Sequence, residues 1–150
     1  MYCTVEEVAG MIKDDMIDVI LGDQPIEDRE QQQEMLRELI PGAIGDACSE
    51  IDGYLAGRYP VPFEKTPAML NKLAKDIAVY NLVSRQGIDE SSREKNYLNR
   101  YNQAIKFLTA VAEGKIDIGT SDKSSVSGAG TDFRVESPSR IFSRNSMKGW

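Results

Sequence analysis

One run of apolar side chains with helical spacing constrains the fold of this chain more than any other feature. Between residues 44 and 55 the apolar positions recur three and four residues apart, so they share one face of a helix. These positions are Ile44, Ala47, Cys48, Ile51, Tyr54 and Leu55. Because such a face must be buried against other elements, the sequence predicts that this helix packs inside a helical bundle.

The N-terminal region carries a second helix signal, followed by an interruption. Thr4 and Glu7 form a capping-box pair, in which each side chain satisfies a free amide at the start of a helix. Asp14 and Asp15 then interrupt the apolar face, which resumes after them until Gly22. We therefore expect a first helix that is bent or broken near residue 14.

Proline and glycine residues suggest further element boundaries. Residues 26–39 favour a helix by propensity, and we predict that Pro41 and Gly42 separate this segment from the next helix. Gly57 is a natural C-terminal stop, and Pro60 and Pro62 predict an extended segment over residues 58–63.

Two more helices are predicted, from residue 68 to about 85 and from about 92 to 113. Their predicted boundary residues are Thr66 with Pro67, then Gly87, Ser91 or Ser92, and Gly114. The sequence thus indicates an all-α body, residues 1–114, built as a small bundle of four to five helices.

The composition changes after the body. Residues 119–131 are rich in Gly and Ser, and cannot build a core. Spaced apolar residues follow this linker, namely Phe133, Val135, Ile141, Phe142, Met147 and Trp150. We interpret residues 115–150 as a linker and an extended C-terminal arm that docks on a partner; the alternative is a frayed tail.

The chemistry available to the chain is narrow. Its 150 residues include no histidine and two cysteines, which excludes Ser-His-Asp and Cys-His catalysis and histidine-ligated zinc. Asp14, Asp15 and Asp18 lack the spacing of a calcium loop, so surface acidity is the better interpretation. We expect no enzyme activity, cofactor or metal. No apolar run approaches about 20 residues, so we expect no membrane span.

Charge is distributed unevenly along the chain. Residues 1–57 contain 14 acidic and 3 basic side chains, a net charge of −11, whereas residues 58–114 carry +3 and residues 115–150 carry +2. An acidic helical segment repels a phosphate backbone, which argues against ordinary DNA binding there. The gradient is consistent with a solvated acidic face, or with acidic and basic surfaces that meet between neighbouring subunits.

Two segments resemble the phage Mu gp36-like family of tailed-phage and prophage proteins. The first, at residues 50–62, reads EIDGYLAGRYPVP. The second, at residues 140–150, reads RIFSRNSMKGW and is similar to the aromatic-Ser-Arg and Lys-Gly-aromatic ending of that family. The matching positions are Asp52, Gly53, Tyr54, Gly57, Arg58, Tyr59 and Pro60, then Phe142, Ser143, Arg144, Lys148, Gly149 and Trp150.

The resemblance implies a head–tail connector or head-completion protein. Such a protein would form a ring, with twelve subunits expected, between portal and tail in the virion neck after assembly in the host cytoplasm. Genomic DNA would pass through the ring without sequence-specific binding. The net charge of −11 in residues 1–57 adds the hypothesis that these residues line the channel, where repulsion would prevent the DNA from sticking. The alternatives are another neck or tail-terminator protein, or, in a different class, a regulatory helical protein that binds nucleic acid.

The expected interface residues come from both motifs and from the arm. They are Gly53, Tyr54, Gly57, Arg58, Tyr59, Phe133, Arg140, Phe142, Arg144, Lys148 and Trp150. Gly53 and Gly57 would permit close approach of another backbone. Arg58 would either neutralise free carbonyl groups at a helix end or pair with a neighbour's carboxylate. Phe142 and Trp150 are the expected aromatic anchors.

Overall fold

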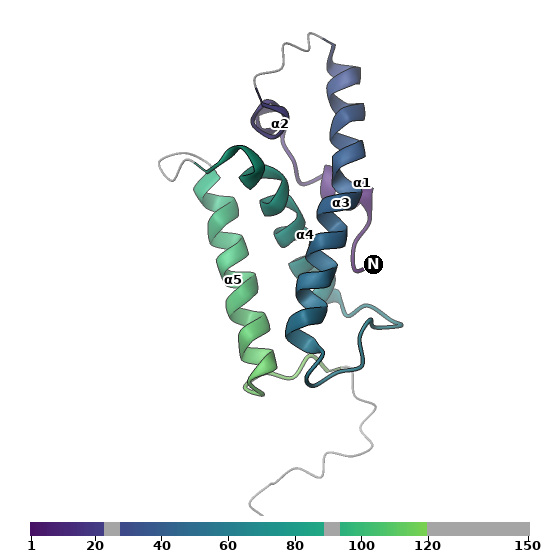
Figure 1. Ribbon diagram of the computed structural model, residues 1–150, viewed down its shortest axis with the longest axis vertical. Helices are drawn as coiled ribbons and strands as arrows, with labels where there is room; N and C mark the ends of the chain where they lie inside the picture. Colours follow the sequence, from purple (N-terminus) through teal and green to yellow (C-terminus); the bar gives the residue numbers. More distant parts are fainter. Residues whose placement is uncertain (23–27, 89–93, 120–150) are drawn as a thin grey trace, which may run out of the picture. The chain divides into compact units, whose positions relative to one another are not determined.

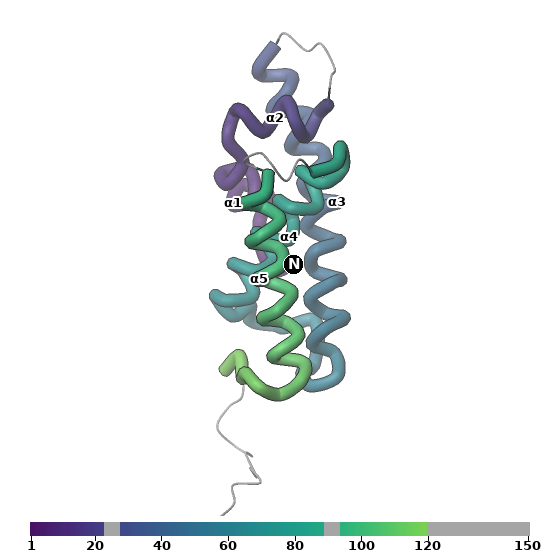
Figure 2. Tube along the Cα trace, turned by 90° about the vertical axis from the view of Figure 1, so that its left-hand side faces the viewer, coloured from purple at the N-terminus to yellow at the C-terminus, as the bar shows by residue number. Residues whose placement is uncertain are grey.

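The computed structural model describes residues 1–22, 28–88 and 94–119, and this part of the chain is an all-α bundle without strands. The elements are α1 (Val5–Ala9), α2 (Asp14–Leu21), α3 (Arg29–Leu55), α4 (Ala68–Val83), the short 3-10 helix η1 (Ser84–Gln86) and α5 (Glu94–Ala112). Helices α3, α4 and α5 run side by side, and α2 crosses near the N-terminal half of α3 (Figures 1 and 2). The predicted small helical fold is confirmed.

The core lies between the three long helices. α4 packs against both α3 and α5, and each helix contributes side chains that are fully buried. The largest of these on the long helices are Ile40, Ile44, Ile51, Leu55, Leu70, Ile77, Leu82 and Leu108. The predicted apolar face of residues 44–55 therefore points into the core, except that Cys48 and Tyr54 remain half-buried at its edge.

The predicted break at Pro41 and Gly42 is wrong, because α3 continues through both residues. A proline inside a helix removes one backbone hydrogen bond, but Pro41 lies on the exposed side, where water can satisfy the freed carbonyl group. Ile40 and Ile44 are completely buried on the opposite side. Burial of the apolar side chains that precede and follow Pro41 in the chain thus outweighs the local cost of the proline.

The predicted interruption of the first helix is confirmed. α1 ends at Ala9 and α2 begins at Asp14, whose carboxylate lies in the first helical turn, where a negative charge is favourable. Gly22 ends α2 with a φ of 75°, a conformation that suits glycine.

Three other helix boundaries can be compared with the prediction. Thr66 is not the cap of α4: Pro67 occupies that position without a side-chain hydrogen bond, and the helix begins at Ala68. Gly87 and Gly114 follow η1 and α5 with φ values of 96° and 82°, as expected of glycine stops. The predicted serine cap before α5 falls outside the described residues.

In the part of the chain that the structure describes, no helix combines the length and the apolar character needed to cross a membrane.

Candidate interaction surfaces

The motif turn after α3 is used within the chain to hold the end of α5. Arg58 Nη1 donates hydrogen bonds to the carbonyl oxygens of Val111 and, at 3.4 Å, Ile116. Its guanidinium group also lies 5.6 Å from the centre of the Tyr59 ring. Because the last carbonyl groups of a helix carry partial negative charge, a cation here stabilises the C-terminus of α5.

Gly114 lies against the Arg58 side chain. A Cβ atom built at Gly114 would be 3.6 Å from the central guanidinium carbon, which is an ordinary contact distance, so it is the φ of 82° at this position that favours glycine. The glycine stop and the arginine are therefore parts of one arrangement, in which the chain turns sharply below α5 and the guanidinium group fills the turn.

Tyr59 holds residues 117–118, which follow the turn at the end of α5. Its hydroxyl group donates to Asp117 Oδ1 at 3.3 Å and accepts a hydrogen bond from the backbone amide of Ile118 at 3.5 Å. The backbone amide of Gly119 in turn donates to Asp117 Oδ1 at 2.8 Å. The chain is thus attached to the bundle until Gly119, the first of the Gly/Ser-rich residues 119–131.

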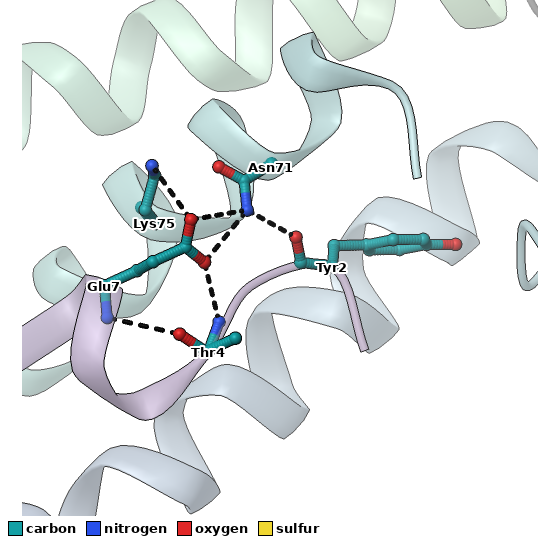
Figure 3. A network of polar contacts seen from close by, with 5 residues as sticks. All are labelled: Tyr2, Thr4, Glu7, Asn71 and Lys75. Atoms are coloured by element: carbon teal, nitrogen blue, oxygen red, sulfur yellow. Dashed lines mark hydrogen bonds and ion pairs between the residues drawn. The ribbon is translucent and has the colours of Figure 1, made fainter. Parts of the chain in front are cut away.

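The N-terminal segment forms a second polar network, which Figure 3 shows at close range. The predicted capping box is present: the Glu7 amide donates to Thr4 Oγ1 at 3.3 Å and the Thr4 amide donates to Glu7 Oε2 at 2.9 Å. The same carboxylate accepts from Asn71 Nδ2 and pairs with Lys75 Nζ at 3.7 Å, both on α4. These donors lower the pKa of Glu7, with the Thr4 amide as the largest cause.

Tyr2 connects the N-terminus to three other segments. Its carbonyl oxygen accepts from Asn71 Nδ2 at 2.9 Å, and its hydroxyl group donates to Asp52 and accepts from the amide of Phe63. Burial, and then the hydrogen bond to Asp52, raise the pKa of Tyr2 to about 12. Asp52 of the first family-like motif therefore anchors the N-terminus within the same chain.

A second tyrosine–carboxylate pair joins α3 to α5. Tyr101 donates to Glu50 Oε1 at 2.9 Å, and its ring stacks on Tyr80 with 4.1 Å between the ring centres. Burial, followed by the hydrogen bond to Glu50, raises the pKa of Tyr101 to about 12. The Tyr101–Glu50 pair thus joins two helices, and the Tyr2–Asp52 pair joins the N-terminal segment to α3.

The outward side of α3 is unusually bare. The α3 outer face, which we define as the exposed residues between 38 and 57, consists of Glu38, Pro41, Gly42, Gly45, Asp46, Ser49, Gly53, Ala56 and Gly57. A Cβ atom built at any of its four glycines meets no described atom within 4 Å apart from neighbouring positions of the chain, and none of the four has a positive φ. A glycine within a helix costs roughly 0.5–1 kcal/mol relative to alanine. Neither crowding nor backbone geometry in the described residues explains these glycines.

The outward side of α5, in contrast, carries polar and cationic side chains. The α5 outer face, the exposed residues between 95 and 106, consists of Lys95, Asn96, Asn99, Arg100, Asn102, Gln103 and Lys106. All are cationic or amide-bearing side chains, with three cations and no acid. Arg100 is partly neutralised, because its Nε lies 3.7 Å from the buried carboxylate of Asp76.

A groove borders the α5 outer face. It has a volume of about 670 Å³ and is lined from α5 by Tyr97, Arg100 and neighbouring amides. Residues of α2 and just before it complete the lining, namely Met11, Lys13, Asp15 and Met16, so one acidic side chain borders the cations of α5. Its mixed polar and apolar lining is typical of a surface for another macromolecule rather than of an enclosed active site.

The cysteines and acidic residues do not form a reactive or metal site in the described part of the chain. Cys3 is buried, and burial raises the pKa of its thiol to about 11, so the reactive thiolate is disfavoured. No group of three or more potential ligands that could hold a metal ion occurs among the described residues.

Comparison with known proteins agrees with the family resemblance of the two motifs. The family described as Bacteriophage Mu, Gp36 matches residues 2–137 of this chain. The chain belongs to the phage Mu Gp36 family. The gp36 protein of the Mu-like prophage FluMu from Haemophilus influenzae is 33% identical over 108 residues, covering 72% of each chain. Gene product J of Escherichia phage Mu is 31% identical over 109 residues, again covering 72% of each chain.

In this Gp36-family chain, the expected interface residues of the first motif fall into two groups. Gly53 and Gly57 lie on the α3 outer face, where an added Cβ atom would meet no described atom other than those of neighbouring positions in the chain. Arg58 and Tyr59 are instead engaged with the end of α5, and Tyr54 is half-buried. A role of these three in an interface with another subunit stays a prediction.

The remaining expected interface residues, Phe133, Arg140, Phe142, Arg144, Lys148 and Trp150, lie outside the described residues. Two features of the structure were not expected from the sequence. The contacts of Asn71 and Lys75 with Glu7 are one, because no local spacing relates α4 to the N-terminus. The part of the α3 outer face that precedes Gly53 is the other, since Pro41 and Gly42 predict a boundary there.

Proposed function

We propose that this chain is a structural virion protein, a head–tail connector or head-completion protein that forms a ring between portal and tail. Family membership indicates a phage structural or morphogenesis protein and supports this assignment at the coarser level. In this proposal the protein is not an enzyme. It acts in the virion neck, binds the portal and a tail or neck protein, and lets the genome pass.

The observation that carries the proposal is the attachment of residues 116–118 to the motif turn after α3. Arg58 and Tyr59 fix this segment to one end of the bundle, so the following residues start from a defined place. The Gly/Ser-rich residues 119–131 can then serve as a linker, which brings the aromatic residues near the C-terminus to a partner.

A phage or prophage that encodes this chain allows a direct test. Its gene is replaced by a version that lacks residues 133–150, and by a full-length version with Phe142→Ala and Trp150→Ala. We expect both to accumulate as folded protein, and we expect electron micrographs to show filled heads and free tails that fail to join. Ser125→Ala, a change in the linker, is the matched control and should give infectious particles.

Two results would contradict the connector proposal. If heads without residues 133–150 still joined tails at the normal yield, the arm would have no part in joining. If heads failed to form or to fill, the protein would act earlier in assembly than the connector role requires.

A further inference from the structure

The bare surface of α3 requires an explanation from outside the described bundle. Each of Gly42, Gly45 and Gly53 weakens a helix relative to alanine, yet a Cβ atom at any of the three would meet no described atom outside its own stretch of α3. A helix face with few large side chains allows another surface to approach its backbone. The carbonyl oxygen of Gly45 already accepts a second hydrogen bond from Ser49 Oγ at 2.9 Å, and other exposed carbonyl oxygens of this face can accept one as well.

The surface that fits this face is present on the same molecule. We propose that the α3 outer face of one copy docks on the α5 outer face of a second copy. Glu38 and Asp46 are the two charges of the α3 outer face, and they would meet Lys95 and Lys106 of the neighbour. The amide side chains of α5 would donate hydrogen bonds to the exposed α3 backbone, in the space that the glycines leave open.

The charges also decide how the copies are arranged. Two α3 outer faces placed against each other would bring acids together, and two α5 outer faces would bring cations together, so self-pairing of either face is disfavoured. The contact is therefore heterologous, with two different faces used by each copy. Such a contact leaves one free face at each end and continues into a ring or an open chain.

The positions of the two helices suit this arrangement. α3 and α5 lie on opposite sides of the bundle in Figure 1, with α4 between them farther back. A copy can thus contact one neighbour through α3 and another through α5 at the same time. This inference rests on the proposed ring, and it names the surfaces through which the ring would form.

The test uses the purified full-length chain and two variants that each block one face. Gly45→Leu with Gly53→Leu fills the α3 outer face, and Lys95→Glu with Lys106→Glu reverses the charge of the α5 outer face. In sedimentation velocity experiments over a range of concentrations we expect the wild type to self-associate. Each variant should associate at least tenfold more weakly, with the helical content in circular dichroism unchanged.

Matched controls lie on α4, which belongs to neither face. Ala68→Leu adds the same kind of bulk at an exposed helical position, and Lys72→Glu makes the same charge reversal. Both should associate like the wild type. Because leucine is a better helix former than glycine, the α3 variant should be at least as stable as the wild type, which separates lost association from lost folding.

Mixing the two blocked variants gives the sharpest result. The α3-blocked chain keeps its α5 outer face, and the α5-blocked chain keeps its α3 outer face, so a one-to-one mixture should form heterodimers and nothing larger. A wild type that stays monomeric at every concentration, variants that associate normally, or a mixture that stays monomeric would each overturn the inference.

A third variant, which lacks residues 133–150, tests whether the C-terminal arm rather than a second copy covers the α3 outer face. If deletion of residues 133–150 abolished association while the α5-blocked chain still assembled, the arm would occupy the α3 outer face and the inference would be wrong. The sedimentation samples contain this chain alone and no other phage protein. A protein that failed to join heads and tails could still show this contact, so the two proposals can fail separately.

Discussion

Arg58 donates a hydrogen bond to the carbonyl oxygen of Val111, which joins the turn after α3 to the last turn of α5. The two residues are 53 positions apart in the chain. Through this bond one side chain closes the bundle at the end where the C-terminal segment leaves it. The sequence suggested Arg58 as an interface residue. In the structure it stabilises the helical body of its own chain.

Replacement of Arg58 should loosen this end of the bundle. We expect Arg58→Ala to lower the free energy of unfolding by about 1–2 kcal/mol, because the α5 carbonyl groups lose a charged donor. Urea unfolding measures the change, with Lys72→Ala as the control for loss of one exposed cation. Arg58→Lys should recover only part of the loss, since a lysine lacks the planar guanidinium group. Equal stability of all four proteins would contradict this role.

The tyrosine–carboxylate pairs should make the protein sensitive to alkali. The pKa values of Tyr2 and Tyr101 are raised from 10.0 to about 12 in the folded chain, so the unfolded chain loses these protons first as the pH rises. Their contribution to stability is complete below pH 10 and is lost as the pH approaches 12. Thermal unfolding at a series of pH values from about 9 to about 12 measures this decline.

The variant Tyr2→Phe removes one of the two titrating groups. It should be less stable than the wild type near neutral pH, because Asp52 and the Phe63 amide lose their partner, but its stability should fall less steeply with rising pH. Tyr59→Phe is the control, since it also removes a hydrogen-bonded hydroxyl group, the one that donates to Asp117, but belongs to neither pair. A Tyr2→Phe curve parallel to that of the wild type would argue against the assigned cause.

Glu7 should make the stability of the protein depend on pH in the acidic range. Its pKa is lowered from the ordinary 4.5, so its contribution to stability is present above that pH and is lost as the pH falls further. Glu7→Gln should therefore reduce stability at neutral pH and flatten the decline below pH 4.5. Glu6→Gln, the exposed neighbour in the same helical turn, should leave the profile unchanged, and a similar effect of both variants would be the contrary result.

Pro41→Ala should stabilise the protein. α3 passes through Pro41 at an exposed position, so alanine restores a backbone hydrogen bond and removes the clash of the ring. We expect a gain of about 1–3 kcal/mol in the free energy of unfolding. Gln33→Ala, another exposed position of α3, should change stability by much less. A loss of stability in Pro41→Ala would show that the packing of α3 depends on a proline-induced bend.

Local patterns predicted much of the body because the forces behind them act over a few residues. The spacing of Ile44, Ile51 and Leu55 showed which side of the helix is buried, and Thr4 with Glu7 showed where α1 begins. Pro41 misled the prediction, since its cost is local and known, whereas the compensating burial of Ile40 and Ile44 depends on the other helices that pack against α3. Thr66 misled it by one residue for the same reason, because Pro67 and the incoming chain set the start of α4.

By itself the sequence determined that this chain forms an all-α bundle, that its charge is graded from acidic to basic, and that it resembles the Gp36 family. Helix periodicity, composition and motif order contain this information directly. Only the tertiary structure decided that Asp52 holds Tyr2, that Arg58 closes α5, and that the glycines of α3 form a bare outer face. These relationships join residues some 50 positions apart or depend on which helix sides remain uncovered, and packing of the whole bundle settles both.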